Sequence, residues 1–250
     1  MKKTNDNEFL VELFSLIIIV TVVQAYNVAA MARDKEFVPE RDMYTILHDY
    51  EPETCVILSL WAFFIIGYKS RAIMRARRLL DTDLLSLPPG VRILPEDSRE
   101  YARQVEALPA ELQSELLPRA LLSGLHRFGA TRNIQDVAFA IRETCNLETD
   151  RLDSELSMVR FVAWAIPAIG FVGTVRGIGN SLQQAHKAVE GDVSGVVAGL
   201  GTSFNSTLVA LSLSITVMLC LHQMQLRQER TVLDTENYLD THLIRHLQMR

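Results

Sequence analysis

The chain has 250 residues, 48% of them hydrophobic, and carries a formal net charge of −5 at pH 7. The mild acidity and the lack of a basic patch with interleaved aromatic residues argue against a nucleic-acid-binding protein. The hydrophobic fraction by itself is ordinary for a globular protein. However, the apolar residues are concentrated in segments that exclude charge, which predicts a membrane protein. Three widely separated cysteines, Cys55, Cys145 and Cys220, show no metal-binding spacing and are expected to be inert.

The first two apolar segments predict two membrane-spanning helices near the N-terminus. Residues 13–32 contain no charge, and about 20 such residues are enough to cross the hydrocarbon layer of a bilayer. No small-residue cleavage site follows, so this segment is expected to be a retained anchor. Residues 54–68 form a shorter, marginal span, which Pro52 could extend by opening the helix at its first position. A buried or interfacial helix is the alternative for this second segment.

Two further spans are predicted in the C-terminal half, and the charges indicate their orientation. The third span begins near Arg160, and the fourth covers residues 193–225. Basic residues precede the first span and follow the second at residues 69–78, whereas residues 33–53 are net acidic. The positive-inside rule then places both termini and residues 69–160 in the cytoplasm.

The segment between the second and third spans is predicted to be helical. A linker rich in helix breakers at residues 86–98 is followed by helical patterns at residues 98–108 and 110–129. Asn133 could cap a longer helix, whose apolar stripe meets no proline or glycine before Pro167. We therefore expect the third span to continue this helix without interruption, over about 50 Å.

These elements predict an all-α membrane protein with four transmembrane helices, the third and fourth long and extending into a helical cytoplasmic domain. The expected organisation is two N-terminal spans with a short extracytoplasmic loop (residues 1–68), a helical cytoplasmic segment (69–158), spans three and four (159–226) and a C-terminal cytoplasmic helix (227–250). This last segment has the apolar periodicity of an amphipathic helix.

Spans three and four each carry a stripe of small and hydroxyl residues on one helix face. The spacings alternate between three and four residues, which keeps the stripe on one side. The first stripe is Ala163, Pro167, Gly170, Thr174, Gly177 and Ser181, and the second is Ser203, Thr207, Ala210 and Ser214. Small faces let helices approach closely, and hydroxyl groups offer hydrogen bonds where lipid offers none. Helix packing alone is one interpretation of these stripes, and a path for water or an ion is the other.

No Asp or Glu lies inside spans three and four, although a proton path normally needs an ionisable group in the membrane. A conducting assembly would therefore need a carboxylate from a second subunit. Arg160 is in phase with the first stripe, at its inner mouth. Arg176 lies off the stripe near the outer end, where we expect its side chain to extend to the membrane surface.

The run IPAIGFVGTVRGI, residues 166–178, resembles the signature of the MotA/TolQ/ExbB proton-channel family, and FNSTLVALSLSI, residues 204–215, is similar to the last helix of that family. By this resemblance, Thr174 and Thr207 take the places of two pore threonines, and Pro167 takes the place of a helix kink. Departures are Ala210, where glycine is usual, and Thr202, where TolQ- and ExbB-like members have glutamate. Four spans with a central cytoplasmic segment look more like the flagellar-stator branch.

The resemblance implies a non-enzymatic subunit of a stator in the bacterial inner membrane, driven by H⁺ or Na⁺ and needing no cofactor. Five copies would surround two single-span partners of the MotB/TolR/ExbD type, each with one membrane aspartate. The residues expected along the ion path are Thr174, Thr207, Ser203, Pro167, Gly170 and Ser181, with Arg160 at the pore mouth. Ion flow would be converted into rotation or mechanical work.

The sequence also bears on two other classes of protein. A non-conducting membrane scaffold would use the same small-residue faces for packing alone. A metal enzyme is disfavoured because His242 and His246, one helical turn apart, lie in a polar tail without a third ligand. No phosphate-binding glycine loop is present either.

Overall fold

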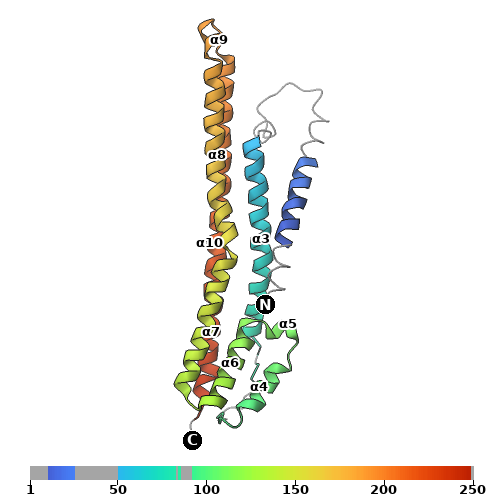
Figure 1. Cartoon of the computed structure of the whole chain (residues 1–250), viewed down its shortest axis with the longest axis vertical. Helices are drawn as coiled ribbons and strands as arrows, with labels where there is room; N and C mark the ends of the chain where they lie inside the picture. Colours follow the sequence, from blue (N-terminus) through green and yellow to red (C-terminus); the bar gives the residue numbers. More distant parts are fainter. Residues whose placement is uncertain (1–10, 26–49, 83, 86–91, 249–250) are drawn as a thin grey trace. The chain divides into compact units, whose positions relative to one another are not determined.

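The structure, a computed structural model, describes residues 11–25, 50–82, 84–85 and 92–248 (Figure 1). Its described part is helical except for one isolated β-bridge. The helices are Val11–Ala25, α3 (Tyr50–Leu80), α4 (Ser98–Glu106), α5 (Ala110–Gln113), α6 (Leu116–Thr131), α7 (Ile134–Glu155), α8 (Ser157–Gln183), α9 (Ala185–Val189), α10 (Ser194–His242) and a 3₁₀ turn, η1 (Ile244–His246). They form two compact units, the first from Met1–Gly67 and Ser157–His222 and the second from Tyr68–Leu156 and Gln223–Arg250.

Within the described residues, three helical stretches are long and apolar enough to cross a membrane: Tyr50–Leu80, Ile134–Gln183 and Ser194–His246. The helix Val11–Ala25 is apolar but shorter. Residues 26–32, the remainder of the predicted first span, lie outside the described residues, so a fourth span stays a prediction. In the first unit this helix packs along α3, since the Trp61 indole N–H donates to the Glu12 carbonyl at 2.9 Å.

The helix that contains the second predicted span extends beyond residues 54–68 at both ends. It begins by Tyr50 and continues to Leu80, so the basic residues after position 68 belong to the same helix. Pro52 lies inside the first turn and not at its first residue; a proline is tolerated there because the first N–H groups of a helix have no partner within it. Acidic residues in the first turn and arginines in the last turn both suit the helix dipole.

The predicted uninterrupted helix from residue 134 into the third span is broken once. Asn133 does cap α7, with its Oδ1 accepting from the Gln135 N–H at 2.9 Å. However, α7 ends at Glu155 and α8 begins at Ser157. The Leu156 N–H bonds to the Asp153 carbonyl, three residues back, and its side chain is fully buried. Neither proline nor glycine marks this single-residue break, which accompanies burial of the Leu156 side chain.

The predicted helix at residues 110–129 is also divided, into the short α5 and the longer α6. Pro118 is the third residue of α6. Its missing N–H costs no hydrogen bond in the first turn, whereas it would break the interior of a helix that ran continuously from residue 110. Pro118 therefore favours a fresh helix start near Leu116.

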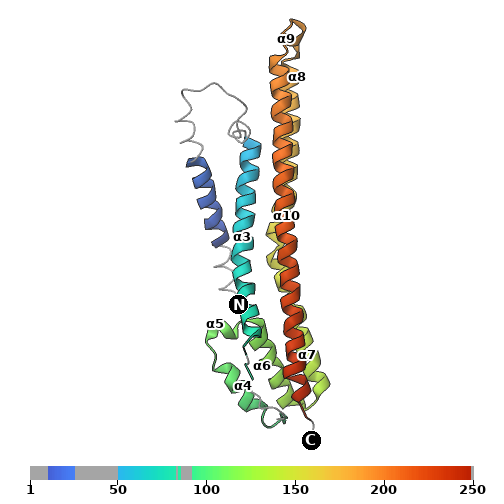
Figure 2. The same cartoon turned by 180° about the vertical axis from the view of Figure 1, so that it is seen from behind.

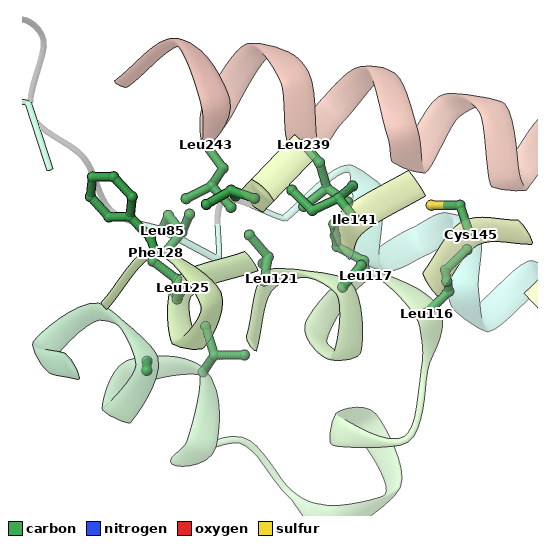
Figure 3. Close-up of a cluster of buried hydrophobic side chains, with 14 of the residues drawn as sticks. Leu85, Leu116, Leu117, Leu121, Leu125, Phe128, Ile141, Cys145, Leu239 and Leu243 are labelled. Carbon is green, nitrogen blue, oxygen red and sulfur yellow. The ribbon is translucent and has the colours of Figure 1, made fainter. Parts of the chain in front are cut away.

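The second unit is organised around one apolar core (Figure 3). Phe128 of α6 and Ile141 of α7 meet Leu239 near the end of α10 and Leu243 just after it, and all four side chains are essentially buried. α10 runs through residue 227 without a break, so the predicted C-terminal helix is the distal part of α10, and its apolar face enters this core. The Ile93 N–H donates to the His246 carbonyl at 2.8 Å, and the Gln248 N–H donates to the Ile93 carbonyl at 3.1 Å. These two bonds form the isolated β-bridge between Ile93 and Leu247.

Candidate ion path between α8 and α10

The two stripes predicted from sequence face each other in the first unit, where α8 and α10 run side by side in both views (Figure 1 and Figure 2). A Cβ atom added to Gly170 would collide with Cβ of Ala210, and one added to Gly177 would meet the Ser203 side chain. At Gly199 the obstacle would be the Ser181 side chain. The glycines therefore permit an approach that alanine would prevent, as expected for small-residue helix faces in a membrane.

Thr174 and Thr207 lie opposite one another at the centre of this contact. Their hydroxyl groups are hydrogen-bonded to each other. Thr174 Oγ1 also lies 3.2 Å from the Gly170 carbonyl oxygen and 3.4 Å from that of Ser203, and Thr207 Oγ1 lies 3.2 Å from the Gly170 carbonyl oxygen. Each hydroxyl has one proton to donate, so these acceptors compete for it. Both threonines are half-buried, and they form a compact group of hydroxyl and carbonyl oxygens.

Pro167 leaves one backbone carbonyl of α8 without its usual helical donor, and a side chain of α10 donates to it instead. A proline at position 167 has no N–H to donate to the Ala163 carbonyl, four residues earlier. This carbonyl therefore has no hydrogen-bond donor from position 167 of its own helix. The Ser214 hydroxyl of α10 donates to this carbonyl at 3.0 Å, and both residues are buried. Neighbouring helices commonly restore such hydrogen bonds in membrane proteins. Pro167 and Ser214 therefore act together in joining α8 to α10.

The other predicted path residues are used mainly in helix contact. Ser181 and Ser203 are almost completely buried, and each hydroxyl donates to its own helix, to the carbonyls of Gly177 at 2.9 Å and Gly199 at 2.7 Å. Gly170 is buried beneath Ala210. Of the six residues predicted along the path, only Thr174, Thr207 and Pro167 keep partial exposure in the single chain. Arg160, the predicted mouth residue, is half-buried in the first turn of α8.

An ion pair that the sequence did not indicate joins α3 to α8. Arg176 Nη2 lies 2.8 Å from Glu51 Oε2. The Glu51 side chain is 10% exposed, and the Arg176 guanidinium also lies over the Tyr50 ring, 5.9 Å from its centroid. Arg176, expected to extend to the membrane surface, is also paired with a residue in the first turn of α3. The partners are 125 residues apart in sequence, and no periodic pattern connects them.

The outward faces of α8 and α10 are apolar and exposed. On α8 they carry Phe161, Trp164, Phe171, Val172, Val175 and Leu182, and on α10 Phe204, Leu208, Leu211, Ile215, Met218 and Leu219. Such faces suit lipid or neighbouring helices. Among the residues that the structure describes, no group of His, Cys, Asp and Glu side chains is arranged to hold a metal ion.

Outside the spans, the carboxyl groups of the described residues Glu115 and Asp192 have shifted pKa values. Burial raises the pKa of Glu115 above its usual 4.5, against the opposing effect of nearby arginines that include Arg75. At the turn before α10, hydrogen bonds from the Ser194 hydroxyl and backbone N–H lower the pKa of the exposed Asp192 carboxyl. Neither group lies among the striped residues of α8 and α10.

The comparison with known protein families matches a region that includes both striped helices. The sequence model of the MotA/TolQ/ExbB proton channel family matches residues 112–237, half of the chain, which includes α6, α7, α8 and most of α10. No curated protein matches the chain. With the family match covering both striped helices, the chain belongs to the MotA/TolQ/ExbB proton channel family.

Proposed function

We propose that the chain is the ring-forming subunit of a proton-driven stator and that Thr174 and Thr207 lie at the centre of its ion path. Membership of the family makes it a multi-pass membrane protein and a non-enzymatic channel subunit that works with a MotB/TolR/ExbD-type partner. Beyond this, we infer that protons (or Na⁺) pass along the face shared by α8 and α10. Their flow then drives rotation or mechanical work against the partner.

The observation that carries this proposal is the pair of threonines within apolar stretches of α8 and α10 that contain no carboxylate. From Ser157 to Gln183 and from Ser194 to His222 there is no Asp or Glu. A proton path in a membrane needs an ionisable group. The hydroxyl and carbonyl oxygens around Thr174 and Thr207 can bind a carboxyl group but cannot replace it. The missing group therefore fits an aspartate on the transmembrane helix of the partner.

The threonine pair can serve both protonation states of such an aspartate. When the aspartate is ionised, the two hydroxyls turn away from the Gly170 carbonyl and donate to the carboxylate, which lowers the cost of its charge in the membrane. When a proton from outside neutralises the carboxylate, the acid becomes a donor to a carbonyl or hydroxyl oxygen, and the threonines return to Gly170. Release of that proton to the inside completes one transfer.

The topology and assembly are part of the same proposal. Four spans with both termini in the cytoplasm of a bacterium are supported by the apolar helix Val11–Ala25 and by the basic last turn of α3. Five copies around two partner helices follow from the family resemblance. The exposed apolar faces of α8 and α10 supply surface for neighbouring copies and lipid. The four segments 1–68, 69–158, 159–226 and 227–250 are retained as the proposed functional organisation.

The test is proton flux through the native complex in membrane vesicles, followed with a pH-sensitive dye. Thr174→Val and Thr207→Val keep side-chain size but remove the hydroxyls. Each hydrogen bond to a charged group contributes about 1.5–3 kcal/mol, so either variant should slow flux by about tenfold or more. Thr216→Val is the matched control, because Thr216 is exposed on α10 and bonds only to its own helix at the Ser212 carbonyl. Normal flux in both pore variants would contradict the proposal.

A non-conducting scaffold is the second candidate. It is favoured by the near-complete burial of Ser181 and Ser203 in helix contacts, which shows that much of the stripe serves packing. A scaffold should assemble and dock normally with valine at both threonine positions. A stator should assemble normally but lose its ion-driven work.

A further inference from the structure

The ion pair between Glu51 and Arg176 lies beside the threonine pair and not merely at a helix end. Gly173 immediately precedes Thr174, and Ser206 immediately precedes Thr207. A Cβ atom at position 173 would lie 3.2 Å from both Cβ and Cγ of Glu51 and 3.0 Å from Cβ of Ser206. Glu51, Gly173 and Ser206 therefore form one packed layer directly next to the layer of the two threonines.

The charges hold this layer in one arrangement. The Glu51 side chain is 10% exposed and Arg176 is 47% exposed, and their nearest charged atoms are 2.8 Å apart. A charged side chain in a membrane-spanning segment is costly unless it is paired, so either partner alone would have to move toward water. Movement of Glu51 would empty the space beside Gly173, and movement of Arg176 would break the ion pair that joins α8 to the first turn of α3.

A neighbouring carboxylate shows that this arrangement is specific to one face of α3. Glu53, two residues further along the same turn, accepts instead from Gln24 Nε2 at 2.6 Å, on the helix Val11–Ala25. Glu51 and Glu53 thus lie within one helical turn, but the polar partner of Glu51 is on α8, whereas that of Glu53 is on the helix Val11–Ala25. This provides a matched comparison within one helical turn.

We propose that Glu51 and Arg176 are positioning residues of the ion path: their ion pair fixes α3 against α8 in the register that keeps Thr174 opposite Thr207. The inference rests on the proposed function of the two threonines. It extends the path to a third helix, α3, and gives an acidic residue outside the two striped helices a role in proton transfer without making it a carrier of the proton.

The test measures the position of the threonines and the flux separately. In a chain whose three native cysteines are replaced by alanine, the pair Thr174→Cys and Thr207→Cys is oxidised in native membranes, and intramolecular disulfide formation is followed by electrophoretic mobility. Glu51→Gln or Arg176→Gln should slow cross-linking by about tenfold, the scale of a coupling lost between contacting groups. With the threonines intact, the same variants should reduce proton flux. Glu53→Gln should change neither measurement.

Conservative and exchanged charges separate positioning from general folding. Arg176→Lys should retain most of the cross-linking, and Glu51→Arg combined with Arg176→Glu should restore part of what each single change removes. An unchanged cross-linking rate in Glu51→Gln and Arg176→Gln overturns the proposal, as does reduced flux with normal cross-linking. If Thr174→Val and Thr207→Val conduct normally while Glu51→Gln still slows cross-linking, the proposed function fails and the positioning role stands.

Discussion

Gly170 offers the most direct test of the contact between α8 and α10. A methyl group at this position would collide with Cβ of Ala210 and would lie 3.5 Å from the Ser206 carbonyl oxygen and from Cα of Thr207. Since backbone atoms of α10 lie directly behind Ala210, the collision cannot be relieved by turning a side chain, and the helices must separate. Overpacking of this kind costs about 1–3 kcal/mol. Gly170→Ala should therefore lower the stability of the detergent-solubilised protein by that amount and weaken the hydrogen bond between the threonines.

The chain contains both a control and a compensating change. Gly179 lies on the same helix, and a Cβ atom there would meet nothing within 4 Å. Gly179→Ala should be neutral or stabilising by up to about 1 kcal/mol, because alanine has the higher helix propensity. Ala210→Gly removes the atom that collides, so the double variant Gly170→Ala with Ala210→Gly should recover most of the lost stability.

Thermal unfolding is measured on all four variants, together with cross-linking of cysteines at the threonine positions. These measurements give the coupling free energy between positions 170 and 210. We expect a coupling of about 1–3 kcal/mol, as found for residues in contact. Equal stability of Gly170→Ala and Gly179→Ala, or additive effects in the double variant, would refute the close helix contact.

Two further predictions concern hydrogen bonding and protonation. Ser214→Ala leaves the buried Ala163 carbonyl without a donor and should cost about 1–3 kcal/mol in thermal unfolding. The cost of Ser214→Ala should be smaller in a Pro167→Ala chain, where the alanine supplies the missing N–H. An equal cost with proline and with alanine at position 167 would contradict the idea that Ser214 replaces this donor. Because burial raises the pKa of Glu115, the folded chain holds this proton more tightly than the unfolded chain, and stability falls as pH rises from the usual value of 4.5 through the raised one. Glu115→Gln should therefore raise the unfolding temperature at pH 7 and have less effect near pH 4; a gain of the same size at both pH values would exclude this origin.

Local signals in the sequence were sufficient where neighbouring residues decide the structure. The side chain of Asn133 caps α7 as expected, because a cap depends on hydrogen bonds within the next few residues. The stripes through Thr174 and Thr207 were correctly placed on single faces, since helical periodicity depends only on spacing. The family was also recognisable from the run around Pro167.

Where the sequence analysis differed from the structure, distant contacts or burial decided the outcome. No proline or glycine lies at the break between α7 and α8, so the sequence does not predict it. The break accompanies burial of the Leu156 side chain. α3 continues through residues 69–80, so the basic residues predicted to follow the second span belong to the same helix; a helix leaving the apolar layer can continue with a polar surface.

The sequence by itself determined that α8 and α10 present small, hydroxyl-bearing faces, that residues 157–183 and 194–222 contain no carboxylate, and that Pro167 leaves a carbonyl without its helical donor. These properties follow from residue type and from the 3.6-residue period. Only the tertiary structure decided that the two faces meet each other, that Ser214 supplies the missing donor, and that Glu51 pairs with Arg176. The physical reason is that such contacts depend on the register between helices far apart in the chain, and side-chain packing and charge pairing set that register only when the helices are together.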